Sequence, residues 1–138
     1  MKPEFLFHGS SIYIKGFLTP RLATDKQKLD NSQNAVYATN NRDAALAMSL
    51  FDKGKNMCGT MSYNQKKTKI TLSKEPDKNT PRFLYKVSSQ TFSERPKNSG
   101  QWLSYKKVQI VETTIFKTQD LENLYEVDLE LCNKIQKR

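Results

Sequence analysis

The sequence predicts a single α+β domain, residues 1–138, with mainly antiparallel sheets. Three observations predict this class. Short segments with strand character recur at irregular spacing, a helical pattern occurs once early and once late, and the strand–helix–strand rhythm of a parallel sheet is missing. The chain is long enough to bury a core, and it carries neither an internal repeat nor a linker that would divide it.

The expected strands are rich in β-branched and aromatic residues and are bounded by Gly, Pro, Asn or Ser. Where apolar residues alternate, as at Phe83, Tyr85 and Val87, they are expected to share one side of the strand. Pro20 is expected to break the second segment. In chain order the segments are residues 5–9, 16–22, 35–39, 68–73, 82–87, 101–105 and 107–116.

A first helix is expected directly after the strand at residues 35–39. Asn40 or Asn41 can cap its N-terminus, Asp43 suits its first turn, and Gly54 closes it. The predicted buried stripe of this helix consists of Ala44, Ala47, Met48 and Phe51.

A second helix is expected near the C-terminus, where Thr118 can act as the cap. The Lys- and Asn-rich stretch before residue 68 is expected to be a long loop, and residues 93–100 a turn-rich connection. Beyond Val127 the pattern is ambiguous. The inward-facing residues of the second helix would be Leu121, Leu124 and Tyr125.

The formal net charge of +9 is concentrated in one part of the chain. Between Lys53 and Lys86, nine basic residues stand against Glu75 and Asp77. Such a block can attract the phosphates of a dinucleotide, a nucleic acid or an acidic protein. The same lysines also suit a solvated loop beside an edge strand. No aromatic residues are regularly interleaved with them, as a base-stacking platform requires.

Cysteine and histidine usage limits the possible chemistry. Cys58 and Cys132 are the only cysteines and His8 is the only histidine, so the usual structural zinc sites are excluded and no metal is expected. Two cysteines do not make a disulfide scaffold, so a reducing, cytoplasmic setting is the default expectation. Neither a secretory signal pattern nor a run of about 20 apolar residues is present, and we expect a monomer without a membrane partner.

His8 is the first candidate for a binding residue. A lone histidine on an apolar strand is commonly a hydrogen-bonded structural residue, but here Gly9 and Ser10 follow it in the string FHGS. Glycine lets a ligand approach the backbone, and serine offers a hydroxyl beside it. An imidazole presents a donor and an acceptor that suit a ribose hydroxyl.

Three strings, FHGS with His8, AVYAT with Tyr37 and GQWLSY with Gln101, together resemble the ADP-ribosyltransferase fold, in its diphtheria-toxin-like and poly(ADP-ribose) polymerase branch. Members carry a histidine in an H-G-S/T string, a tyrosine in a strand-to-helix Y-x-A/S string, and a glutamate that opens a late strand. The matching places are His8 in FHGS, Tyr37 in AVYAT and Gln101 in GQWLSY, and GFLTPR resembles the family segment after the first motif. The resemblance covers residues 5–52 and, more weakly, 100–116. The layout is also similar to that of small bacterial and phage proteins.

The resemblance implies two packed, mainly antiparallel sheets with a few helices, and NAD as the substrate. His8 would hold the adenine-side ribose, and Gly9 would bond the nicotinamide carboxamide through its backbone. Ser10 would bond a ribose hydroxyl, and Tyr37 would stack on the nicotinamide ring. Arg21 is our own candidate for a diphosphate contact, because a guanidinium group matches phosphate oxygens.

Two positions depart from the family pattern. Met48 stands where the polymerase branch has a second tyrosine, and would make a looser contact with the nicotinamide ring. The helix pattern places Met48 in the core instead. Gln101 replaces the glutamate: it can accept a hydrogen bond from the ribose 2′-hydroxyl, but it brings no negative charge to the oxocarbenium-like centre. Losing such a group typically costs about 3–4 kcal/mol. The predicted catalytic residues are His8, Tyr37 and Gln101.

The neighbours of Gln101 narrow the possible acceptors. Family members that modify arginine carry an E-x-E arrangement at this place, and Ser99 stands at its first position. Arginine is therefore disfavoured as the acceptor. Glu94 and Glu112 are the nearest carboxylates and would reach the site only if the loop folds back. Trp102 is expected to face away from the pocket and into the core.

The sequence therefore predicts a mono-ADP-ribosyltransferase that transfers ADP-ribose from NAD to an unknown protein or nucleic-acid acceptor and releases nicotinamide. Two alternatives stay open. One is a catalytically weak or inactive NAD- or ADP-ribose-binding module of the same fold. The other is a nucleic-acid-directed protein that uses the basic segment 53–86. The enzymatic hypothesis requires the His8 imidazole and the Tyr37 phenol to converge on one cleft.

Overall fold

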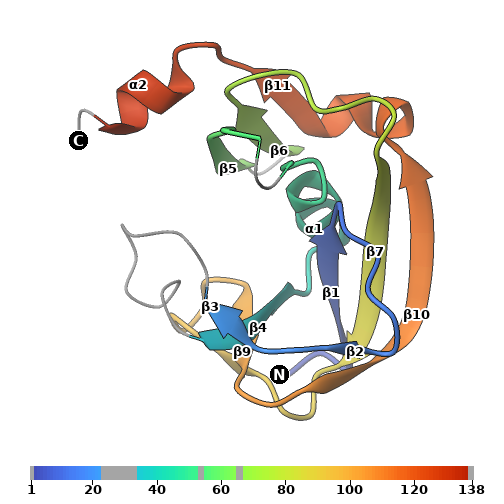
Figure 1. Ribbon diagram of the computed structural model, residues 1–138. Coiled ribbons are helices and arrows are strands. Elements are labelled where there is room, and N and C mark those ends of the chain that lie inside the picture. The colour runs from blue at the N-terminus through green and yellow to red at the C-terminus, as the bar shows by residue number, and fades with distance from the viewer. Residues whose placement is uncertain (1, 23–33, 53–54, 65–66, 137–138) are drawn as a thin grey trace. The chain divides into compact units, whose positions relative to one another are not determined.

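The computed structural model describes residues 2–22, 34–52, 55–64 and 67–136 (Figure 1). It is a mixed α+β structure with mostly antiparallel strands and few helices, as the sequence predicts. The strands are β1 (Phe5–Ser10), β2 (Phe17–Leu18), β3 (Arg21–Leu22), β4 (Asn34–Thr39), β5 (Gly59–Asn64), β6 (Lys67–Leu72), β7 (Pro81–Ser88), β8 (Ser93–Glu94), β9 (Gln101–Ser104), β10 (Val108–Lys117) and β11 (Tyr125–Val127). The helices are α1 (Arg42–Met48), the 3-10 helix η2 (Thr118–Leu124) and α2 (Leu131–Gln136).

The chain forms two compact units, each assembled from separate segments of the sequence. Because each unit takes segments from both halves of the chain, neither could be recognised as a contiguous stretch. Unit 1 consists of Met1–His8, Ile14–Arg42 and Tyr85–Thr113. Unit 2 consists of Gly9–Tyr13, Asp43–Leu84 and Thr114–Arg138.

Unit 1 is built on strands of an eight-stranded sheet with the order β2-β10-β7-β1-β4-β9-β8, in which β3 also pairs with β4. Strand β4 pairs antiparallel with β9 from Val36 opposite Ser104 to Thr39 opposite Gln101. The predicted break at Pro20 is confirmed, since β2 ends before it and β3 begins after it. The unit is centred on fully buried apolar side chains, among them Leu6, Tyr85, Val87 and Leu103.

Unit 2 contains a three-stranded sheet of order β11-β6-β5. Strand β5 falls in the stretch expected to be a loop, and that expectation is wrong. The apolar content of β5 is low, but Met61 lies opposite Ile70 and Gly59 opposite Leu72, so its inner side completes the packing of β6. Strand β11 is short and runs parallel to β6, with Tyr125 opposite Ile70.

Helix α1 is shorter than expected and is buried differently. It ends at Met48. Beyond it, Leu50 N–H donates to the Ala47 carbonyl and Phe51 N–H to the Met48 carbonyl, so isolated turns continue to Phe51. Gly54 lies outside the described residues. The prediction of a buried Met48 is wrong, because its side chain is 47% exposed. The buried residues are four in a row, Ala44, Ala45, Leu46 and Ala47, so the helix is covered on more than one side.

The late helix also differs from its prediction. Residues Thr118–Leu124 form a 3-10 helix whose N-cap is Lys117, without a side-chain capping bond. Thr118 does not cap the helix, because its hydroxyl is buried against the Thr80 carbonyl at 2.9 Å and accepts Arg82 Nε–H at 2.7 Å. Leu121 is buried as predicted, whereas Tyr125 already belongs to β11.

A fully buried guanidinium group joins the elements of unit 2. Arg82 Nη1 donates to the Asp52 carboxylate at 2.5 Å and to the Ser49 carbonyl at 3.0 Å, and Nη2 donates to the Asp77 carbonyl at 2.8 Å. Together with the bond from Nε to Thr118, these contacts connect one guanidinium group to the segment after α1, to the turn before β7 and to η2. Asp52 also accepts Asp77 N–H at 2.8 Å. Each ion of the buried pair therefore makes further hydrogen bonds in addition to those with its counterion.

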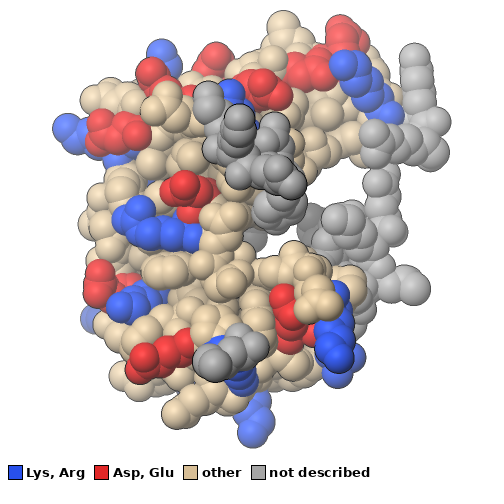
Figure 2. All heavy atoms as spheres, turned by 180° about the vertical axis from the view of Figure 1, so that it is seen from behind, with Lys and Arg blue, Asp and Glu red and all other residues tan. Residues whose placement is uncertain are grey.

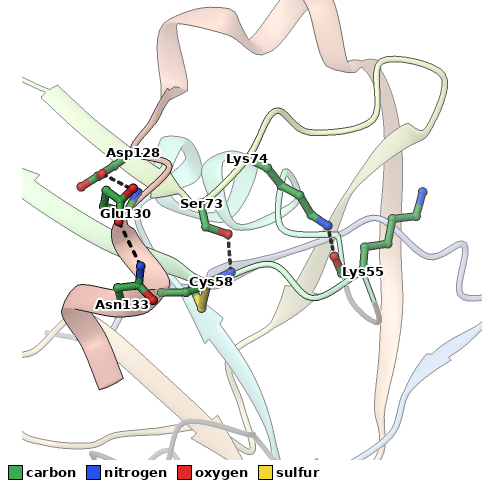
Figure 3. The surroundings of a disulfide bond; sticks show 8 residues. Lys55, Cys58, Ser73, Lys74, Asp128, Glu130 and Asn133 are labelled. Carbon is green, nitrogen blue, oxygen red and sulfur yellow. Dashed lines mark hydrogen bonds between the residues drawn. A yellow bond between two sulfur atoms is a disulfide. The ribbon is translucent and has the colours of Figure 1, made fainter. Parts of the chain in front are cut away.

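Cys58 and Cys132 form a disulfide, which corrects the expectation of two reduced thiols. The bond joins the segment entering β5 to helix α2 across a sequence separation of 74 (Figure 3). Around it, Cys58 N–H donates to Ser73 Oγ at 2.8 Å, and Asn133 Nδ2 donates to Glu130 at 2.9 Å. The sequence could not reveal the pairing, because it depends on which elements meet in space.

We expect Cys58→Ser to lower the free energy of unfolding by about 2–4 kcal/mol, since a cross-link over so many residues restricts the unfolded chain. Urea unfolding with and without dithiothreitol measures this loss. Reductant should destabilise the unmodified chain by a similar amount and leave Cys58→Ser unchanged. Equal stability of the oxidised and reduced chains would contradict the prediction.

The charge of the molecule is distributed differently from what the linear sequence suggests. Described residues of unit 1 include nine Lys and Arg against three Glu, whereas those of unit 2 include eight Lys and Arg against nine Asp and Glu. In unit 2, Lys55 pairs with Asp77 at 3.0 Å. The Asn79 main-chain N–H and Lys55 lower the pKa of Asp77 to about 2, which keeps it ionised. On the face seen in Figure 2, cations and carboxylates are interspersed.

Candidate functional site

Three of the predicted site residues lie on one face of the sheet in unit 1. Tyr37 is opposite Leu103 and Thr39 is opposite Gln101, so Tyr37 and Gln101 are diagonal neighbours on the same side of the β4–β9 ladder. Diagonal neighbours of this kind are separated by about 7–8 Å. Arg21 is opposite Ala35, two residues before Tyr37, and therefore shares that side. Strands β3, β4 and β9 lie side by side in Figure 1.

His8 reaches the same strand through the main chain of Tyr37. Its Nδ1 lies 2.6 Å from the Tyr37 carbonyl oxygen. A carbonyl only accepts, so Nδ1 carries the hydrogen, and the neutral imidazole has its acceptor at Nε2. The recorded register puts Phe7 opposite Thr39, and alternation sends the His8 side chain off the other side of β1. There its ring stacks on Tyr85 with the centroids 6.2 Å apart, so the register does not bring the His8 imidazole and the Tyr37 phenol to one side of the sheet, as the enzymatic hypothesis requires.

Gly9 has a packing role that the sequence does not disclose. A Cβ at this position would lie 1.7 Å from the Ala45 carbonyl oxygen and 3.2 Å from the Ser49 nitrogen. Both are backbone atoms of the α1 segment, so a side chain here would require the helix to move. The approach of a ligand to Gly9 stays a prediction, and the group that the structure places against Gly9 is α1.

Gly9→Ala is expected to lower the free energy of unfolding by about 3 kcal/mol, at the upper end of the range for overpacked sites, because the clash is with backbone. Thermal unfolding followed by far-UV circular dichroism measures the change. Gly16→Ala is a suitable control: its Cβ would meet nothing within 4 Å, so only its φ of +82° opposes the substitution. A smaller loss for Gly9→Ala than for Gly16→Ala would disprove the packing role.

Ser10 and Met48 both belong to unit 2. The Ser10 side chain is buried, and its Oγ accepts Ile12 N–H at 3.0 Å, which shapes the turn after β1. Met48 is exposed on α1, so its predicted place in the core is wrong. Its contact with a nicotinamide ring stays a prediction. Arg21, at the edge of unit 1, is also exposed.

Gln101 is held in a defined orientation by the loop before β9. Its Nε2 donates to the Arg95 carbonyl at 3.0 Å, and its own carbonyl accepts Arg95 N–H at 2.9 Å. Because the amide nitrogen faces the Arg95 carbonyl, the amide oxygen is the atom directed away from it. A glutamate at this position would bring two acceptor oxygens together, which gives a local physical reason for an amide at residue 101.

Glu94 has a structural task in the same loop. Its carboxylate accepts the N–H of Asn98 and of Gly100, each at 2.9 Å. Both donors lie at positive φ, 66° and 79°, so this carboxylate bridges a tight turn. The loop does fold back, since Glu94 pairs with Trp102, but this register sets Glu94 on the opposite side of β9 from Gln101.

Trp102 faces away from Gln101, as predicted from strand alternation. It lies opposite Ala38 on β4 and Glu94 on β8. The side chain is partly buried, and within the described residues its indole Nε1 has no hydrogen-bond partner. Sequence reasoning did not anticipate Tyr85, whose ring supports His8 and whose hydroxyl accepts Ile14 N–H at 2.7 Å.

In the part of the chain that the structure describes, no group of three or more His, Cys, Asp or Glu side chains could hold a metal ion. No helix among those residues has the length and apolar character needed to cross a membrane. Comparison of the chain with protein-family models, curated proteins and solved structures found no match.

Proposed function

We propose that the chain has an ADP-ribosyltransferase-like fold and acts as an NAD-dependent mono-ADP-ribosyltransferase, a glycosyltransferase that uses NAD as its substrate. The observation that carries the proposal is the common face shared by Arg21, Tyr37 and Gln101, with His8 bonded to the Tyr37 main chain. Three strings far apart in the sequence thus contribute to neighbouring strands. The side chains of Tyr37 and Gln101 share a face, and His8 contacts that part of the sheet through the Tyr37 main chain.

In the proposed reaction the bond between ribose C1′ and the nicotinamide nitrogen breaks, and its electron pair leaves with nicotinamide. A nucleophile of the acceptor forms the new bond to C1′ and releases its proton to solvent. Tyr37 offers a ring for the nicotinamide to stack on, and the Gln101 amide oxygen accepts a hydrogen bond from the ribose 2′-hydroxyl. The acceptor state of His8 Nε2, set by the Tyr37 carbonyl, suits a second ribose hydroxyl.

A weakly catalytic or inactive NAD- or ADP-ribose-binding module is the second candidate. The specific observation in its favour is the Gln101 amide, which is bonded to Arg95 and carries no charge. Such a site can bind a ribose yet stabilise little of the positive charge that develops as nicotinamide leaves.

Gln101→Glu separates the two candidates. It should raise nicotinamide release from NAD by roughly a hundred- to thousand-fold if the site is built for transfer. It should also destabilise the protein by about 0.5–1.5 kcal/mol, because the exposed hydrogen bond to the Arg95 carbonyl is lost. Gln101→Met is the matched control, which loses the same hydrogen bond without adding charge. A folded Gln101→Glu protein with no more release than Gln101→Met would refute the transferase.

The cytoplasmic location expected from the sequence rested on reduced cysteines. Disulfides form and persist in oxidising surroundings and are rare in the cytosol, so the Cys58–Cys132 bond removes that basis. Alkylation of thiols during cell lysis, followed by mass analysis of the intact chain, distinguishes the two settings. Two alkylated cysteines would restore the cytoplasmic expectation, and none would favour an oxidising compartment.

A further inference from the structure

Unit 1 contains two segments whose sequences have basic residues but no carboxylates. Residues 14–22 and 95–111 contribute six Lys and Arg and no Asp or Glu. The two segments meet where β2 pairs with β10, with Phe17 opposite Gln109 and Leu18 opposite Val108. Of these six residues, Lys15, Lys106 and Lys107 lie next to this pairing.

Two exposed aromatic rings lie within these segments. Phe17 is 44% exposed and Tyr105 is 50% exposed, although both are large enough to bury. The Lys107 Nζ lies 4.5 Å from the centroid of the Phe17 ring, so a cation and an aromatic face are already side by side. Lys15 and Lys106 are the adjacent exposed lysines.

The backbone that presents these side chains is held firmly. Buried Ser104 accepts Lys106 N–H at 3.2 Å and lies 2.7 Å from Thr91 Oγ1, which fixes the turn carrying Tyr105. The Gly16 carbonyl accepts Ile110 N–H at 2.9 Å, which anchors the segment from Lys15 to Phe17 on β10. Little ordering is then needed when a ligand binds.

We propose that Lys15, Phe17, Tyr105, Lys106 and Lys107, here called the Phe17–Tyr105 surface, bind single-stranded nucleic acid. Lysines match its phosphates, and exposed rings stack on bases, which a duplex keeps covered. This surface is distinct from the basic segment 53–86 considered above. In that segment Arg82 is buried against Asp52, and Lys55 is paired with Asp77.

Fluorescence anisotropy with labelled single-stranded DNA and RNA of mixed sequence, and with the corresponding duplexes, tests the proposal on the full chain. Single strands should bind at 50 mM salt and duplexes more weakly. Phe17→Leu and Tyr105→Leu keep apolar bulk but remove the ring, and each should weaken binding by roughly 5- to 100-fold. Lys106→Ala with Lys107→Ala should reduce the dependence of log affinity on log salt by about 1.4, the value for two single-strand phosphates.

The matched control is Lys78→Ala with Lys117→Ala, which removes the same charge from unit 2 and should leave binding to single strands within about twofold of the unmodified chain. Circular dichroism and Trp102 fluorescence confirm that each variant is folded. The proposal is overturned if no single strand binds at 50 mM salt or if duplexes bind as tightly. It is equally overturned if both ring variants bind like the unmodified chain or if the control pair loses as much affinity. None of these residues belongs to the proposed NAD site, so nicotinamide release is an independent readout.

Discussion

Arg82→Met is expected to lower the free energy of unfolding by about 3–5 kcal/mol, the largest of the stability effects that we predict. Arg82 is fully buried, and its removal leaves the Asp52 carboxylate, itself only 4% exposed, without its counterion. The carbonyls of Ser49 and Asp77 lose a donor at the same time. Urea unfolding monitored by circular dichroism measures the change.

Lys134→Met is the control for Arg82→Met, because its pair with Asp128 at 2.7 Å is largely exposed to solvent. An exposed pair contributes at most about 1 kcal/mol. The double variant Arg82→Met with Asp52→Leu removes both charges, and should be more stable than Arg82→Met alone because no lone ion stays buried. Equal losses for Arg82→Met and Lys134→Met would show that the buried pair does not hold unit 2 together.

His8→Ala is expected to reduce nicotinamide release by about 100-fold, because a displaced ribose misaligns the reacting carbon. The same substitution removes the bond to the Tyr37 carbonyl and the contact with Tyr85. Loss of activity alone would therefore not separate binding from structure. The release of nicotinamide from labelled NAD, measured at equal concentrations of folded protein, gives the rate.

Two matched variants separate these roles of His8. His8→Asn can still donate to the Tyr37 carbonyl, because its amide nitrogen can take the place of Nδ1, but it has no group at the place of Nε2. His8→Gln extends further and offers a polar atom near Nε2. A binding role predicts that His8→Asn is stable yet inactive and that His8→Gln keeps part of the activity. Full activity in His8→Asn would assign His8 a structural role only.

The strands were predictable where the sequence has a run of β-branched and aromatic residues. Residues 35–39, 82–87 and 107–116 are strands with bounds close to those expected. Strand β5 was not, because its Asn- and Lys-rich surroundings mask a short inner face that becomes apolar only beside β6. Local composition cannot report a strand that is stabilised mainly by its partner.

The candidate site was predictable in part for a related reason. Motif strings located His8, Tyr37 and Gln101, and the pairing of β4 with β9 brings two of them onto one face. Contacts between distant segments could not be anticipated from spacing. These include the close packing of α1 on Gly9 and the disulfide.

Titration of NAD into the unmodified protein by calorimetry tests most directly whether His8, Tyr37 and Gln101 serve a pyridine dinucleotide. We predict saturable binding of one NAD per chain that Tyr37→Ala abolishes while the protein stays folded. Absence of any binding at millimolar NAD, in protein with the circular dichroism expected of this α+β fold, would contradict the proposed site and the reaction assigned to it.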